Sequence, residues 1–352
     1  MTSASRYLPP YTLNNLLKEL VKSYTLLTIG KSVNLLPIYG LKIGNGPVKV
    51  LIWSQMHGNE STTTRAILEI LKEFETGKFH EILDQLSLFI IPQLNPDGAK
   101  TYTRNNANDV DLNRDAINLT QPESKALKSV FDEFKPDFCF NLHGQRTVFA
   151  AGKNGNPSTL SFLSPAANSS GSVTPARLKA MQIIVAINNN LATRLNNQIA
   201  RYDDAFNLNC VGDLFTTLGA STILFEAGHY PMDYNRDTTL KLVGEAIMIG
   251  LNVIAKKEYI KFCADEYQYI PENSKDYVDI IVNGVTIADG DETLSNQSLA
   301  LQYEEVLDNN RILFQPKCVA YGENLDLIGH QTFLKSDLNI EGSITFKTGK
   351  II

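Results

Sequence analysis

Along the first 260 or so residues, the spacing of apolar residues alternates between two patterns, one that predicts strands and one that predicts helices. Nearly continuous apolar runs rich in β-branched residues are typical of buried strands, and they occur at 48–54, 86–92, 137–142 and 220–225. Apolar residues that recur every three or four positions indicate helices, here at 11–22, 61–74, 121–134, 175–200 and 235–255. Two more strands are expected within 24–43. This alternation predicts an open α/β sheet with helices on both faces.

From about Pro271 the pattern changes. Short apolar runs at 278–282, 311–314 and 343–346 lie between clusters of Gly, Asn and Asp, which predicts a small β-rich appendage over 271–352 after a main domain at 1–265. The appendage has no cluster of His, Cys or paired carboxylates, and its His330 has no evident metal partner. We therefore expect it to shape the rim of a cleft or an oligomer contact and to supply no catalytic group.

Composition and charge narrow the classes of partner. The 352 residues are 43% hydrophobic and 20% charged, with a net charge of −6 and no long basic run. Nucleic acid and an anionic membrane are therefore unlikely main partners by charge, and a small-molecule or peptide substrate is expected, with an oligomer possible. The first ten residues lack a basic segment followed by an apolar one, so no signal peptide is evident and the cytoplasm is the expected location.

Two histidines and a glutamate follow predicted strands. His57 and Glu60 come just after the strand at 48–54, and His143 directly follows the strand at 137–142. Functional residues of open α/β sheets gather beyond the carboxyl ends of the strands. Zinc in hydrolases commonly takes three nitrogen or oxygen ligands and one water. We predict that His57, Glu60 and His143 bind one Zn2+ per chain.

Further polar residues fit hydrolysis beside a metal. Glu226, after the strand at 220–225, is either a solvated strand end or a general base that takes a proton from the zinc-bound water and returns it to the leaving amine. Arg104 and Arg114 fit anion binding, because guanidinium stays charged and can hold a carboxylate through two hydrogen bonds. Asn113 adds amide donors beside Arg114.

Two aspartates are open to more than one interpretation. Asp111 is a candidate partner for the outer nitrogen of a metal-binding histidine, or a surface-loop residue. Asp213 either caps the following helix or lies in a pocket where a buried carboxylate would favour a basic group.

Five motifs, in this order and spacing, resemble the zinc carboxypeptidase family, the funnelins, and its short-loop bacterial branch. They are H-x-x-E at 57–60, N-P-D-G at 95–98, R-x-N-A-x-x-V-D-L-N-R at 104–114, L-H at 142–143 and F-E at 225–226. The resemblance covers about residues 31–255. It implies a mixed, mostly parallel central sheet and a zinc metallocarboxypeptidase that hydrolyses a C-terminal peptide, or murein-peptide-like, amide bond.

The same resemblance assigns roles to the candidate residues. It implies zinc ligands (His57, Glu60, His143), a catalytic base (Glu226), an oxyanion-stabilising cation (Arg104), a carboxylate-binding pair (Asn113, Arg114) and an orienting partner for the first histidine (Asp111).

The chain also departs from the family pattern. Asp115 stands where the family usually has Asn, which would add negative charge next to the carboxylate site. The family's mobile substrate-binding tyrosine has no clear counterpart, with Tyr202 only nearby. The residues after the base, 227–230, differ from the usual continuation. We include Asp213, near the family's specificity pocket, and Tyr230 among the substrate-binding candidates. Asp213 would favour lysine or diaminopimelate.

Two other functions stay open. Residues 57–60, 111–114 and 226–228 are also similar to aspartoacylases and succinylglutamate desuccinylases, which carry a C-terminal β domain and remove an acyl group from an amino acid. An acyl-amino-acid substrate is then expected instead of a peptide, although 95–98 and 104–107 favour the peptidase. The third possibility is a non-catalytic, zinc-containing binding module.

Overall fold

An eight-stranded sheet forms the centre of the main body of the computed structural model, which describes residues 5–289, 292–338, 344–347 and 350–351. The strand order is β1-β2-β4-β3-β5-β9-β7-β8. The strands are β1 (Thr25–Lys31), β2 (Pro37–Ile43), β3 (Val48–Ser54), β4 (Leu86–Ile91), β5 (Phe138–Gly144), β7 (Leu160–Leu163), β8 (Ile199–Arg201) and β9 (Ser221–Ala227). Strands β4, β3, β5 and β9 are parallel, whereas β1, β2 and β7 pair antiparallel with a neighbour. The predicted mixed sheet is confirmed.

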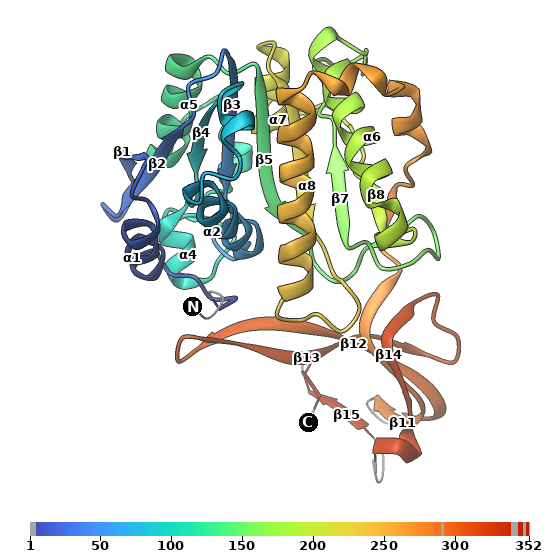
Figure 1. Ribbon diagram of the computed structural model, residues 1–352. Coiled ribbons are helices and arrows are strands. Elements are labelled where there is room, and N and C mark those ends of the chain that lie inside the picture. The colour runs from blue at the N-terminus through green and yellow to red at the C-terminus, as the bar shows by residue number, and fades with distance from the viewer. Residues whose placement is uncertain (1–4, 290–291, 339–343, 348–349, 352) are drawn as a thin grey trace.

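Helices cover both faces of this sheet (Figure 1). One apolar core lies between the sheet and α1 (Pro10–Leu20), α2 (Ser61–Glu75), α6 (Pro175–Leu195) and α8 (Asp237–Ala255). A second core lies on the opposite face, under α5 (Pro122–Phe134) and α7 (Val211–Thr217). The short helices are α3 (His80–Leu83), α4 (Pro96–Thr101), η1 (Leu112–Arg114), η2 (Glu258–Lys261), η3 (Ala264–Tyr269) and η4 (Lys335–Leu338). Burial on two faces explains why the parallel strands read as continuous apolar runs.

The long helix predicted at 175–200 is wrong in its last turn. Helix α6 ends at Leu195, and Ile199–Arg201 forms the edge strand β8 instead. Asn196 and Asn197 have φ values of 33° and 62°. Asparagine tolerates this left-handed conformation, which terminates a helix. The apolar residues of β8 continue the spacing of those in α6, so the sequence pattern did not show where the helix ends.

Helix α8 is long and apolar enough to cross a membrane when judged by length and composition alone. Ten of its residues are buried in the structure, among them Val243, Ile247 and Leu251. Packing between α2 and α6 accounts for its apolar composition, as expected of a helix at the centre of a fold.

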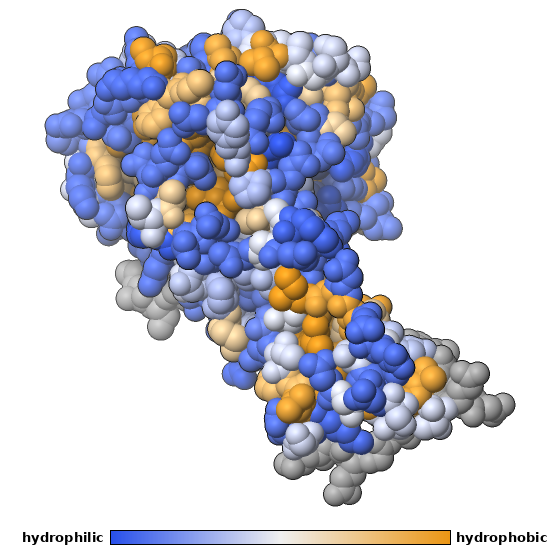
Figure 2. Space-filling model, turned by 90° about the vertical axis from the view of Figure 1, so that its right-hand side faces the viewer, coloured by the Kyte–Doolittle hydropathy of each residue, from blue (hydrophilic) through white to orange (hydrophobic). Residues whose placement is uncertain are grey.

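The C-terminal strands form a separate, narrower lobe (Figures 1 and 2). They are β11 (Tyr277–Asp289), β12 (Glu292–Asp308), β13 (Arg311–Gly322), β14 (Ile328–Leu334), β15 (Ile344–Lys347) and β16 (Lys350–Ile351). The predicted β-rich character is confirmed, although β12 and β14 were not foreseen and Ser343 lies outside the described residues. The two-residue strand β10 (Asn273–Ser274) pairs with β6 (Ala150–Ala151) and joins the lobe to the main body.

Candidate active site

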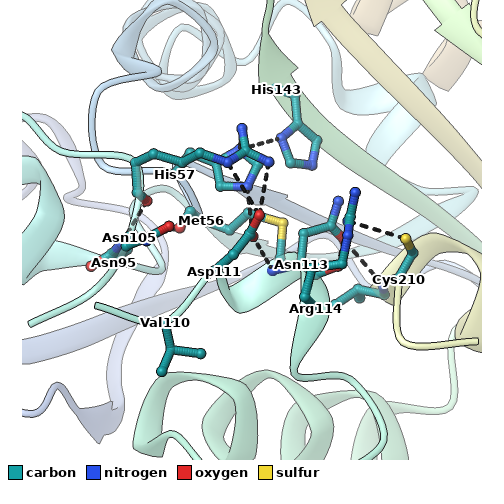
Figure 3. A network of polar contacts seen from close by, with 12 residues as sticks. Met56, His57, Asn95, Asn105, Val110, Asp111, Asn113, Arg114, His143 and Cys210 are labelled. Carbon is teal, nitrogen blue, oxygen red and sulfur yellow. Dashed lines mark hydrogen bonds and ion pairs between the residues drawn. The ribbon is translucent and has the colours of Figure 1, made fainter. Parts of the chain in front are cut away.

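His57, Glu60 and His143 converge beyond the ends of two central strands. His57 follows β3, Glu60 precedes α2, and His143 lies in β5, which pairs with β3. The Nδ1 atom of His57 lies 2.9 Å from Glu60 Oε1, and the Nδ1 atom of His143 lies 3.0 Å from Glu60 Oε2. The two Nδ1 atoms are 3.1 Å apart, and the two imidazoles face each other in Figure 3.

This arrangement fits a metal ion. Two ring nitrogens that face each other share at most one hydrogen between them, so hydrogen bonding alone satisfies them poorly. Candidate ligand atoms of all three side chains lie within 4.8 Å of one another. Zinc binds histidine nitrogen and carboxylate oxygen at about 2.0–2.2 Å, so one ion between them would satisfy all three residues.

Close packing against a short helix holds the loop that carries His57. A Cβ atom on Gly58 would lie 1.9 Å from the carbonyl carbon of Gly98 in α4, so only glycine fits there. The side chain of Asn95 caps α4 by accepting from Gly98 N at 2.8 Å and donates to Met56 O at 3.2 Å. The N-P-D-G motif therefore positions the residue just before His57.

Asp111 links the histidine to Arg104. Its Oδ1 lies 3.0 Å from His57 Nε2, and its Oδ2 accepts from Arg104 Nε and Nη2 at 3.1 and 2.9 Å. Burial lowers the pKa of His57, but the charge of Glu60 and the hydrogen bonds that Asp111 and Glu60 accept from the imidazole raise it overall to about 9. Arg104 also approaches Glu60, with Nη1 at 3.6 Å from Oε1. The imidazole and the guanidinium are thus held by one carboxylate.

The same aspartate leads to Asn113 and Arg114. Asp111 Oδ1 accepts from Asn113 N at 2.8 Å, and Asn113 Oδ1 accepts from Val211 N at 3.0 Å. Arg114 Nη1 contacts Asn113 O and Cys210 Sγ at 2.7 and 3.1 Å. Figure 3 shows this chain of contacts from His57 to Cys210. It places two cationic side chains, Arg104 and Arg114, along one side of the metal-ligand cluster.

Asp115 does not add negative charge to this region, and that expectation is wrong. Its side chain is buried, and it is not among the residues that line the cleft. The carboxylate accepts hydrogen bonds from Thr120 N and Gln121 N, each at 2.9 Å. The aspartate therefore fixes the loop before α5 and does not line the cleft with Arg114.

Glu226 and Tyr202 line the same cleft as the metal-ligand cluster. Glu226 in β9 is the register partner of His143 in β5, and its Oε2 has no hydrogen-bond partner among the described residues. Burial, reinforced by the charge of Glu60, raises the pKa of Glu226 well above its usual range. Burial and the charges of Glu226 and Glu60 raise the pKa of Tyr202 as well. Tyr202 N donates to Phe162 O at 2.9 Å, which places the tyrosine just beyond β8.

These residues line one cleft of about 1020 Å³. Asp213 lies at the end near Arg114, where its Oδ2 accepts from Asn207 N at 2.7 Å. Burial raises the pKa of Asp213 to about 6, although that hydrogen bond and Arg114 oppose the rise. Tyr230 is not among the residues that line the cleft.

Two features of the cleft were not assigned from the sequence. Tyr202 lies 24 residues before Glu226, a longer spacing than the family pattern led us to expect for a substrate-binding tyrosine. Asn141 is fully buried, and neither atom of its side-chain amide has a hydrogen-bond partner among the described residues. Its place two residues before His143, on the same face of the strand, was the available signal. Residues of the C-terminal lobe, from Asp279 to Val319, line the far wall, in agreement with the expectation that the appendage shapes the rim of a cleft.

Comparisons with known proteins agree on one family. The model of the zinc carboxypeptidase family matches residues 12–207. Carboxypeptidase SOL1 of Arabidopsis thaliana is 31% identical over 167 residues, which are 39% of this chain and 34% of that protein. Probable carboxypeptidase 2 of Trichophyton verrucosum is 28% identical over 113 residues, 31% of this chain and 21% of that protein. The matches thus span about a third or less of these relatives' length.

Solved structures resemble the fold of the main body. A metallo-carboxypeptidase from Burkholderia cenocepacia superposes with a TM-score of 0.56 at 16% identity, covering 71% of this chain and 69% of that one. A metallo-carboxypeptidase from Pseudomonas aeruginosa, in complex with (2-guanidinoethylmercapto)succinic acid, gives 0.55 at 18% identity, covering 70% and 68%. At these sequence identities, the similarity shows a shared fold.

Proposed function

Since the chain belongs to the zinc carboxypeptidase family, we propose that it hydrolyses the last amide bond of a peptide that has a free C-terminal carboxylate. One observation carries the proposal. A metal-ligand cluster and the Asn113–Arg114 pair lie in one cleft and are joined through the carboxylate of Asp111. The cluster suits hydrolysis of a carbonyl, and the pair suits an anion beside it.

His57 Nδ1, His143 Nδ1 and the carboxylate of Glu60 would hold the zinc ion. When bound, zinc acts as a Lewis acid toward the scissile carbonyl and lowers the pKa of a water molecule. Asp111 accepts from the outer nitrogen of His57 and so fixes the tautomer in which Nδ1 has its lone pair free for the metal. His143 Nε2 has no hydrogen-bond partner among the described residues. Of the two histidines, His57 is therefore the one whose outer nitrogen is oriented by such a contact.

Glu226 is the proposed proton carrier. Its Oε2, which has no hydrogen-bond partner among the described residues, can accept a proton from the attacking water and return it to the leaving amine. Arg104, held by Asp111, would stabilise the negative charge that develops on the carbonyl oxygen. Tyr202 keeps its hydroxyl hydrogen because its pKa is raised, and can donate it to the substrate.

The side chain of the C-terminal residue would lie between Asn141 and Asp213. The amide of Asn141 is buried without partners, so a polar substrate group would relieve an unfavourable burial. The carboxylate of Asp213 favours a cation such as lysine or diaminopimelate. The Pseudomonas aeruginosa protein, whose fold is similar, binds a compound with a guanidino group, and this supports a basic preference in the proposal. Tyr230 has no part in this proposal because it lies outside the cleft.

The test is a panel of three substrate classes offered to the zinc-loaded protein. N-acylated peptides ending in lysine, arginine or leucine represent carboxypeptidase substrates. Murein peptides ending in diaminopimelate and simple N-acyl amino acids represent the alternatives. We expect release of the C-terminal amino acid from peptides, fastest for a basic residue. Turnover of N-acyl amino acids alone would identify a deacylase, and zinc content without turnover on the whole panel would identify a binding module.

A further inference from the structure

The end of the cleft opposite Arg114 is built on the loop that follows His143. Three contacts from the C-terminal lobe hold this loop. Gln302 Nε2 donates to Thr147 Oγ1 at 2.7 Å, His330 Nε2 lies 2.8 Å from Thr147 O, and Tyr277 N donates to Val148 O at 3.1 Å. The lobe therefore fixes the wall of the cleft immediately beyond the metal-ligand cluster.

Carboxylates in this wall already have partners. Asp279 accepts from Tyr234 Oη at 3.0 Å and from Tyr303 N at 2.7 Å. Glu304 pairs with Lys317 at 2.5 Å. Glu305 binds Arg6 and accepts from Tyr102 Oη. None of these acidic groups forms an ion pair or a hydrogen bond with the two arginines that share the wall with them, among the contacts of the described residues.

Those arginines are Arg146 and Arg236, and both line the cleft. Arg236 is only 2% exposed; its Nη2 donates to Gln145 O at 3.0 Å, while its Nη1 has no hydrogen-bond partner among the described residues. Arg146 is exposed and makes no hydrogen bond or ion pair with another described residue. Arg236 thus donates to the backbone of the residue next to Arg146, and both side chains line the same cleft.

A buried guanidinium nitrogen without an acceptor is unfavourable unless a ligand supplies one. Burial and the positive charge of Arg6 lower the pKa of Arg236 to about 10, so the side chain is still cationic at neutral pH. A carboxylate in the cleft would accept from Arg236 Nη1 and neutralise Arg146. Two neighbouring arginines suit this ligand because guanidinium groups bind carboxylates through directed hydrogen bonds.

The direction of the substrate follows from the order of contacts along the cleft. Asn113 and Arg114 lie on one side of the metal-ligand cluster, linked to it through Asp111. The loop at 144–147 follows His143 directly, and it is held by the C-terminal lobe, whose residues also line the cleft. A peptide whose C-terminal carboxylate meets Arg114 and whose last amide bond lies at the cluster must therefore extend toward the lobe. Its preceding residues reach Arg146 and Arg236.

We propose that Arg146 and Arg236 form an anion subsite that selects peptides with an acidic side chain in the two residues before the C-terminal one. This inference rests on the proposed carboxypeptidase function and adds a preference on the N-terminal side of the cleaved bond. The C-terminal lobe supports the subsite through the contacts to Thr147 and Val148.

The test compares two acetylated tetrapeptides, acetyl-Ala-Glu-Glu-Lys and acetyl-Ala-Gln-Gln-Lys, which have the same length and C-terminus. Binding is measured by calorimetry on zinc-loaded protein with Glu226→Gln, so that the ligand stays intact, and kcat/KM is measured on the otherwise unchanged chain. We expect the glutamate peptide to bind about tenfold more tightly at low salt. Because Arg146 is exposed, added salt should reduce this preference.

Arg146→Gln should bring the two affinities close together, and Arg146→Lys should keep part of the preference. Arg236→Gln should likewise bring the two affinities close together. If the buried position of Arg236 prevents this variant from folding, the variants of the exposed Arg146 alone test the subsite. Arg311→Gln, an exposed arginine of the lobe outside the cleft, controls for the loss of one charge. Equal affinity for both peptides, or a preference that survives Arg146→Gln, would overturn the subsite. Failure of the unchanged chain to cleave either peptide would instead contradict the proposed function, and the binding comparison would still decide the subsite.

Discussion

The two ends of the cleft are built in different ways. At the Arg114 end, Asp111, Asn113 and Arg114 are neighbours in sequence, and the metal-ligand cluster lies at the ends of adjacent parallel strands. At the other end, the walls combine Arg6, the loop after β5 and strands β12 and β13, so that Arg6 meets Glu305 across 299 positions. The comparison indicates that the catalytic groups are supplied by short sequence motifs, whereas the binding of the substrate residues farther from the cleaved bond depends on the lobe.

Removing a metal ligand should have the largest effect. His57→Ala is expected to lose stoichiometric zinc and all measurable hydrolysis, because two ligands remain where zinc needs three from the protein. In the unchanged protein, zinc affinity should fall as the pH drops below about 9, since a protonated His57 cannot bind metal. Metal analysis after dialysis at several pH values checks both statements. Stoichiometric zinc in His57→Ala would remove this residue from the site.

Glu226→Gln should keep the fold and the zinc but lose turnover by about 10²- to 10⁴-fold, because the amide cannot accept and return a proton. The substitution preserves the shape of the side chain. Circular dichroism and zinc content serve as controls beside kcat. Near-native kcat with normal zinc would exclude Glu226 as the proton carrier.

Arg114→Gln should raise KM by about 10- to 100-fold, because a hydrogen bond to a charged partner is lost at the substrate's carboxylate. Arg114→Lys should recover part of the loss, since it restores the charge without the two-pronged geometry. Initial rates over a range of peptide concentrations separate KM from kcat. If KM stayed unchanged in Arg114→Gln, the carboxylate would have to bind elsewhere.

Preference for a basic C-terminal residue should depend on pH through Asp213. Its pKa is raised to about 6, so the carboxylate is charged above that pH and neutral below it. The ratio of kcat/KM for lysine to that for leucine peptides should be greatest above pH 7 and fall severalfold toward pH 5. Use of a ratio cancels the effect of acid on zinc binding. Asp213→Asn should give a low ratio at every pH. If the ratio in the unchanged protein did not vary with pH, Asp213 would have a purely structural role.

The smallest effect is expected at the lobe. His330→Gln removes a contact to Thr147 O but touches no proposed catalytic group. Zinc content should stay stoichiometric and kcat should change only a few-fold, with any loss concentrated in KM for longer peptides. Loss of turnover with zinc and folding intact would show that the lobe belongs to the catalytic machinery.

Much of the main body could be predicted because its signals are local. Strand β3 has the predicted bounds, 48–54, since a strand buried on both faces is apolar at nearly every position. The H-x-x-E, D-L-N-R and L-H motifs identified the residues that the structure brings together around His57. Strand ends that share one edge of a parallel sheet explain why motifs so far apart in sequence meet.

The remaining features depend on contacts that leave little trace in the sequence. Strand β12 was missed because most of its residues are only partly buried or exposed, which blurs the alternation of apolar and polar residues. Tyr202 reaches the cleft because Asn196 and Asn197 end α6 early and allow β8 to form. The expectation for Asp115 failed because a neighbouring position in sequence does not fix the direction of a side chain.

The most direct test of the account compares one peptide in two forms. The zinc-loaded protein is offered an acetylated peptide that ends in lysine, once with a free C-terminal carboxylate and once as the C-terminal amide. If Asn113 and Arg114 hold the carboxylate while the metal-ligand cluster acts on the last amide bond, only the free acid should release its C-terminal residue at a substantial rate. Equal rates for the two forms would contradict the proposal and indicate cleavage of an internal or side-chain amide.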